Sequence, residues 1–205
     1  MLASGNVGQI VSAADGTQQQ PLRIDRQGGL FVVEGRARYA ENTRRGLRYV
    51  GANQAAVTTS AALSTTNTGL ILFNPVNSTV NLEVDKVGLA SLVLMPAVAA
   101  FGIQGGYAGA PLAGTTLDGQ YNAALNGSLG QGIIYKAATT VSPVVRKILG
   151  ALLTGAVTVQ TAAPLTYDLE GSIVVTPGSW ISIYTSTASG ASGIFASLEW
   201  TEVPV

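Results

Sequence analysis

The chain has 205 residues, of which 47% are apolar and only 11% are charged, and its formal net charge is zero. It contains neither histidine nor cysteine, which excludes Ser-His-Asp and Cys-His catalytic arrangements, disulfide bonds and the usual ligands of zinc. Histidine is also the side chain whose unperturbed pKa lies closest to neutral pH. The composition therefore favours packing and assembly over catalysis.

The length fits one large β domain or two small ones. No apolar run is long enough for a transmembrane helix, and residues 1–10 lack the features of a secretory signal, so neither is expected. Residues 1–48 hold seven arginines against four acidic residues, a net charge of +3. This asymmetry predicts an extended N-terminal arm over 1–48 that docks on an acidic neighbour, followed by a body over 49–205. The alternative is an ordinary solvated surface.

The first elements of the chain are short. Residues 1–28 are polar and interrupted by turn signals, which indicates extended chain. A strand is expected over 30–34, and another over 47–50. Residues 37–45 fit one or two helical turns or an extended arm, and the small residues of 51–68 have weak strand character.

The body begins with clearer strands. Residues 69–74 form an apolar run that Pro75 closes, because proline holds its predecessor in extended geometry. Residues 79–89 alternate with a period of two, which predicts a strand with one wet face. The predicted sides are Val80, Leu82, Val84 and Lys86 on one, and Asn81, Glu83, Asp85 and Val87 on the other.

The middle of the chain is harder to interpret. Residues 97–130 are rich in glycine, alanine and asparagine, which predicts long surface loops. Strands are expected over 91–95, 133–137 and 157–161. Residues 144–153 carry a spacing that suits a helical stripe, but the flanking proline and an internal glycine suit strand equally well, and strand is the favoured interpretation.

The C-terminal third has the plainest pattern. Strands over 169–176 and 180–185 are joined by a Pro177–Gly178 turn, and 194–203 forms a last strand. This succession is typical of an antiparallel sandwich, and about eight strands after residue 69 match a jelly roll. The predicted fold is all-β, an antiparallel jelly-roll β-sandwich with an extended N-terminal arm. Strands this apolar predict burial between subunits.

Two pairs of acidic residues are the only candidates for oxygen-ligand metal binding or two-carboxylate glycoside hydrolysis: Glu83 with Asp85, and Asp168 with Glu170. The simpler interpretation is a solvent-facing pair in each case. The glycine-rich segment 126–132 lacks the lysine of a phosphate-binding loop. We therefore expect no catalytic residue, no metal site and no cofactor.

Two groups of residues are candidates for partner binding. The arginines of the arm suit ion pairs with a protein, since lysines and interleaved aromatics that would favour nucleic acid are scarce. These residues are Arg36, Arg38, Arg44, Arg45 and Arg48. The aromatic residues near the C-terminal hairpin suit core or interface anchors, or alternatively a sugar-stacking patch. These are Trp180, Tyr184 and Trp200.

Several segments together resemble small structural proteins of tailed bacteriophages. The segments are 69–75, 80–88, 169–175, 177–178, 199–202, 15–17, 26–29, 44–46 and 52–55. The likeness is to the capsid-decorating or cement type. It implies a jelly-roll homotrimer on the capsid surface of a virion assembled in the host cytoplasm, with the major capsid protein as partner. Neither nucleic acid nor membrane is an expected partner. The alternative is a phage tail or head-fibre receptor-binding protein that recognises glycans through loops 97–130 and 186–193.

Overall fold

The structure is a computed structural model that describes residues 23–24, 30–31, 37–91, 97–116, 120–152, 165–190 and 193–205. The chain divides into two compact units, Met1–Ala40 and Glu41–Val205. In the first unit, β1 (Arg23–Ile24) pairs antiparallel with β2 (Leu30–Phe31). The strand expected over 157–161 lies outside the described residues, as do positions 92–95 of the strand expected over 91–95.

A short helix, α1 (Ala40–Arg44), occupies the middle of segment 37–45. Glu41 in its first turn and Arg44 in its last turn match the polarity of the helix dipole, and their side chains pair at 2.6 Å. The chain then enters the body at β3 (Arg48–Ala52). Arg48 is thus a sheet residue and does not belong to the N-terminal arm in which the sequence placed it.

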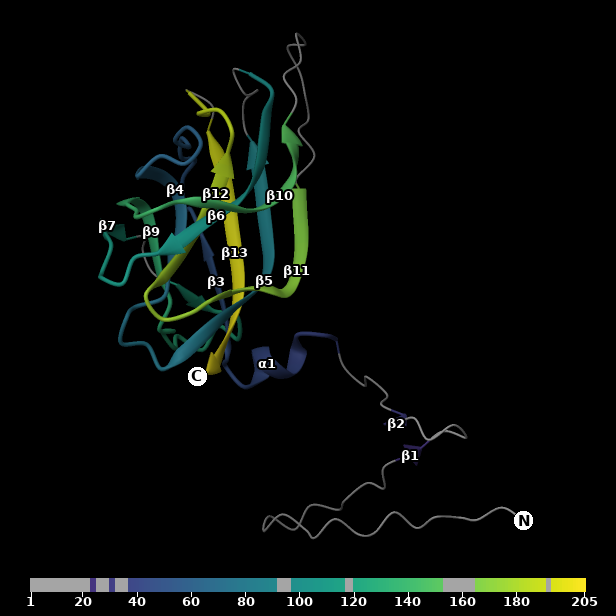
Figure 1. Ribbon diagram of the computed structural model, residues 1–205. Helices are drawn as coiled ribbons and strands as arrows, with labels where there is room; N and C mark the ends of the chain where they lie inside the picture. The colour runs from purple at the N-terminus through teal and green to yellow at the C-terminus, as the bar shows by residue number, and fades with distance from the viewer. Residues whose placement is uncertain are drawn as a thin grey trace. The chain divides into compact units, whose positions relative to one another are not determined.

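Two antiparallel sheets form the second unit (Figure 1). One sheet has the strand order β11-β5-β13-β3-β8, with bounds β5 Val80–Ser91, β8 Tyr121–Asn122, β11 Leu165–Val175 and β13 Ile194–Pro204. The other has the order β10-β6-β12-β4-β9-β7, with bounds β4 Thr66–Phe73, β6 Ala99–Tyr107, β7 Ala113–Thr116, β9 Ile133–Thr139, β10 Val144–Leu152 and β12 Ser179–Thr185. Residues 144–152 of the ambiguous segment 144–153 are therefore strand, which was the favoured interpretation, and residue 153 lies outside the described residues.

The connectivity confirms the predicted jelly roll. Eight strands, β3 to β6 and β10 to β13, alternate between the sheets except at the β6–β10 step, and give the four-strand orders 11-5-13-3 and 10-6-12-4. Such a pair of nested Greek keys defines the fold. The other three strands belong to the insertion between β6 and β10. Of these, β9 and β7 extend one sheet beyond β4, and β8 extends the other beyond β3.

The main core lies between the sheets. Alternate residues of β4, β6 and β12 face residues of β5 and β13, as period-two patterning requires. Trp200 is fully buried there, and its ring stacks on Tyr49 with centroids 6.1 Å apart. Burial of each large apolar side chain stabilises the fold by roughly 1.5–3 kcal/mol, so this layer is the principal source of stability.

The outer face of the six-stranded sheet is also covered. Ile71, Phe73 and Trp180 point away from the main core and form a second cluster with Leu112 and Tyr135. Strands β9 and β10 are consecutive in the chain but lie on opposite sides of β4, β12 and β6, so residues 140–143 cross this face (Figure 1). Because the second half of β4 is buried on both faces, residues 70–73 are all apolar instead of alternating.

The glycine-rich segment 97–130 is not a long loop as predicted, since it contains the buried strand β6. Glycine is required there by close approach of neighbouring backbone. A Cβ on Gly102 would lie 2.0 Å from the Lys147 carbonyl oxygen, and one on Gly105 would lie 2.5 Å from that of Trp180. Glycine in β6 therefore reflects tight strand packing.

The predicted alternation over 79–89 breaks at Asp85. Register pairs Val84 with Trp200 and Lys86 with Glu199, which leaves Asp85 as an extra residue in β5. The β-bulge shifts the inward phase, so Val87 is buried in the core together with Leu82 and Val84, whereas the predicted alternation placed it on the opposite side of the strand from them. A bulge of one residue leaves no mark on the period of the preceding positions.

Candidate functional site

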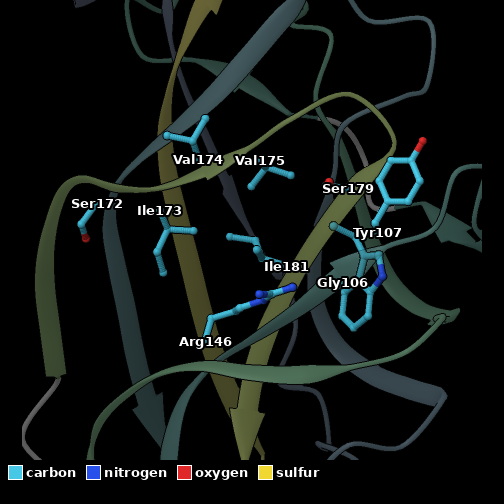
Figure 2. Close-up of a pocket in the computed structure, with 10 residues that line it drawn as sticks. Gly106, Tyr107, Arg146, Ser172, Ile173, Val174, Val175, Ser179 and Ile181 are labelled. Carbon is cyan, nitrogen blue, oxygen red and sulfur yellow. The ribbon is translucent and has the colours of Figure 1, made fainter.

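A pocket of about 400 Å³ opens between the edge strands β10 and β11. Its walls come from four strands: Tyr107 of β6, Arg146 of β10, Ser172 and Ile173 of β11, and Ile181 of β12. Figure 2 shows the Arg146 side chain reaching from β10 toward Ile181, with the β11 residues across from it. The pocket joins an apolar floor to one cationic side chain and several hydroxyl groups.

Arg146 has an incomplete set of partners. Its Nε donates a hydrogen bond to the Gly105 carbonyl oxygen at 3.3 Å. None of the ion pairs found among the described residues involves its guanidinium. Its neighbour Lys147 reaches toward the hydroxyl of Ser172 at 3.5 Å. The terminal nitrogens of Arg146 are therefore available to an oxyanion.

Several exposed apolar side chains lie on the strands and the crossover that adjoin this pocket. Tyr107 is 65% exposed, and four further residues of β10, β11 and the 140–143 crossover are also exposed. We call this set the edge patch: Tyr107, Val141, Val144, Ile148 and Val174. These side chains are available for contact with a binding partner.

A second set of exposed apolar residues lies at the loop that connects β8 and β9. Leu125 there is 89% exposed. The Gln131 side chain accepts a hydrogen bond from the Thr79 amide at 3.0 Å, and the Val205 amide donates to the Thr79 carbonyl at 3.0 Å, so the C-terminus adjoins this loop. We call this set the loop patch: Tyr121, Leu125, Leu129 and Val205.

The arginines predicted to contact a partner do not form one group. Arg36 lies outside the described residues. Arg38 is exposed beside the Tyr39 ring, at 5.4 Å from its centroid, and Arg45 is also exposed. Arg44 pairs with Glu41 of its own helix.

Arg48 was predicted to contact a partner, but it is only 8% exposed and lies within the body. Its Nε is 3.3 Å from Oδ2 of Asp85, and its Nη2 hydrogen-bonds Glu199. Thr201 donates to the same Asp85 oxygen at 2.9 Å. Burial raises the pKa of Asp85 in spite of the opposing effects of Thr201 and Arg48. The sequence misassigned Arg48 because its pairing partners are 37 and 151 positions away.

The predicted aromatic anchors are mostly internal. Trp200 belongs to the main core and Trp180 to the outer cluster, and each is at most 1% exposed. Tyr184 is half-buried. Both tryptophans are therefore core residues, and neither has an exposed ring on which a sugar could stack.

One carboxylate of each acidic pair makes a structural contact. Asp85 belongs to the ion-pair cluster with Arg48, and Oδ1 of Asp168 accepts the Glu170 amide at 3.2 Å in a turn where Glu170 has φ 52°. Within the part of the chain that the structure describes, no three acidic side chains converge as ion ligands would.

The glycine-rich segment 126–132 also has an internal role. Oε1 of Glu202 accepts the Gln131 and Gly132 amides at 2.7 and 3.0 Å. These amides are therefore occupied by a carboxylate of the chain itself.

No model of a protein family, no curated protein and no solved structure matches this chain. None of the described helices is long and apolar enough to cross a membrane.

Sequence reasoning did not single out Arg146 as a site residue. The signal that could have found it is the adjacent pair Arg146–Lys147 inside an otherwise apolar strand.

Proposed function

We propose that this chain is a structural protein of a bacteriophage virion, of the capsid-decoration type. In this role it binds across neighbouring coat subunits on the outside of the head and stabilises the shell as a homotrimer, without catalysis or cofactor. The observation that carries the proposal is a jelly-roll body with exposed apolar side chains in two separate places, the edge patch and the loop patch. The resemblance of several segments to small structural proteins of tailed bacteriophages supports the assignment of this body to a virion.

The two patches suit two kinds of contact. They contain different residues on different elements, so the edge patch can bind another protein while the loop patch lies at the contact between copies. Contacts between copies close into rings when the rotation between them permits, and a trimer is one such ring. Association would bury side chains such as Leu125 that a monomer leaves in water.

The carboxylates support a binding role. Asp85 pairs with Arg48, and Glu202 accepts backbone amides. Both therefore stabilise the fold instead of standing ready as general acids or bases, and the sequence offers no histidine to replace them.

Stabilisation of the shell would follow from linkage. A protein that binds the assembled, expanded shell but not its free subunits stabilises the shell by its binding free energy. Three copies joined in a ring add avidity. The exposed Arg38 and Arg45 are each suited to acidic groups on the coat.

Mixing the purified full chain with expanded phage heads that lack their decoration protein tests the proposal. We expect co-sedimentation at saturating stoichiometry, a higher rupture temperature of the heads, and a trimer mass by light scattering. Unexpanded heads are the matched control and should bind little. A monomer that leaves expanded heads of several phage types undecorated contradicts the proposal.

A further inference from the structure

We propose that the pocket between β10 and β11 is the docking site for an acidic side chain of the partner protein, and that its carboxylate pairs with Arg146. The inference rests on the proposed role in binding another protein and names the chemistry of that contact.

Two β-bulges shape the pocket. In β10 the register passes from Val145 to Lys147, so Arg146 is the extra residue and is turned out of the ladder. In β11 it passes from Asp168 to Ile173, with Glu170 and Gly171 at positive φ. Bulges at sheet edges re-aim side chains and interrupt pairing, and here they lie on the two edge strands that border the cavity.

The charge of the pocket is uncompensated. The single hydrogen bond from Nε to the Gly105 carbonyl fixes the guanidinium at the wall and leaves its terminal nitrogens without an acidic partner among the described residues. A guanidinium presents its donors in a planar fork that matches the two oxygens of a carboxylate. The Ser172 hydroxyl, which accepts a hydrogen bond from Lys147, adds polar character to the wall that β11 forms opposite Arg146.

The surroundings favour a protein over a small molecule. Tyr107 and Val174 line the pocket and are exposed. The edge strand β10, which carries Arg146, also exposes Val144 and Ile148. Arginine and tyrosine within an apolar surround are typical of protein-binding hot spots. A carboxylate with apolar neighbours would pair with Arg146 while its flanking residues cover this patch.

The test uses the full chain and two peptides, an acetylated leucine–glutamate–leucine amide and its glutamine counterpart. In NMR titrations, we expect the acidic peptide to shift the amides of Tyr107 and 173–175, and the glutamine peptide not to. Arg146→Gln should abolish these shifts. Lys147→Gln, which removes the adjacent exposed charge, should retain them and serves as the matched control.

The same variants in the head-binding assay separate the two proposals. Arg146→Gln should weaken decoration about tenfold or more, as expected for loss of a charge-assisted hydrogen bond, and Lys147→Gln should weaken it less. If the heads do not bind the wild-type chain, the proposed function is refuted. Amide shifts on addition of the acidic peptide would still support an acid-binding pocket in that case.

Three results would overturn the docking inference itself. The first is an absence of shifts with the acidic peptide at millimolar concentration. The second is equal binding of acetate and the peptide, which would assign the pocket to small anions. The third is an oligomer that dissociates on Arg146→Gln, which would place a second copy of the chain in the pocket.

Discussion

Arg48 and Asp85 meet inside the sheet, with Nε of the arginine 3.3 Å from Oδ2 of the aspartate. The aspartate is the extra residue of the β5 bulge, and the arginine is the first residue of β3. The pair links two strands that are separated by β13, whose Glu199 and Thr201 complete the cluster.

Removal of the Arg48 charge should destabilise the fold strongly. Arg48→Met leaves the Asp85 carboxylate buried without its cation, and we expect a loss of about 3 kcal/mol in the free energy of unfolding. Arg45→Met removes an equal charge from an exposed position and should change it by less than about 0.5 kcal/mol. Urea denaturation of both variants at pH 7 measures the difference. Equal effects would contradict the structural role of Arg48.

The pH dependence of stability should report Asp85. Burial raises the pKa of this carboxyl, so between the ordinary value near 3.9 and the raised value the folded chain holds a proton that the unfolded chain has lost. The stability that protonated Asp85 contributes to the folded state is fully present below pH 3.9 and is lost as the pH rises through the pKa of this carboxyl in the folded chain. Relative to Asp85→Asn, the wild type should therefore lose stability between pH 3.5 and 7. A relative gain would show that Arg48 dominates over burial.

The Glu202 carboxylate should hold the loop between β8 and β9. Glu202→Ala leaves two backbone donors without their acceptor, with an expected cost of about 1–3 kcal/mol. Glu202→Gln keeps an oxygen acceptor and should cost less. Hydrogen exchange at the Gln131 and Gly132 amides should accelerate in the alanine variant first. Unchanged protection of these amides would mean that other contacts order the loop.

Glycine in β6 should tolerate no side chain. Gly102→Ala places a Cβ against the Lys147 carbonyl of the neighbouring strand, and we expect a loss of at least about 2 kcal/mol from this overpacking. Gly127 has nothing within 4 Å of its Cβ position but has φ +74°. Gly127→Ala should therefore cost only the backbone strain, about 1 kcal/mol. Thermal unfolding of the two variants provides the comparison.

The sequence predicted the jelly roll because its strands and turns carry local signals. The Pro177–Gly178 turn is the clearest case: the Ser179 amide donates to the Thr176 carbonyl at 2.9 Å, and Gly178 has φ 81°. Such turn chemistry depends on adjacent residues alone.

The candidate site was much less predictable. Whether Arg146 points into a pocket depends on a bulge against β6, and whether Arg48 is buried depends on strands far along the chain. Burial of Trp180 depends on the cover of the outer sheet face by the insertion between β6 and β10. Long-range packing determines all three, and period and composition do not record it.

The strand order also has a consequence for biosynthesis. The strands β12 and β13 follow all the other described strands along the chain, yet they occupy central positions, with β12 between β6 and β4 and β13 between β5 and β3. Until they emerge, each sheet is split into halves that have no hydrogen-bonding neighbour on the inner side. The body therefore cannot complete its fold until β12 and β13 have emerged, and nascent chains truncated before residue 179 should expose open strand edges that chaperones bind.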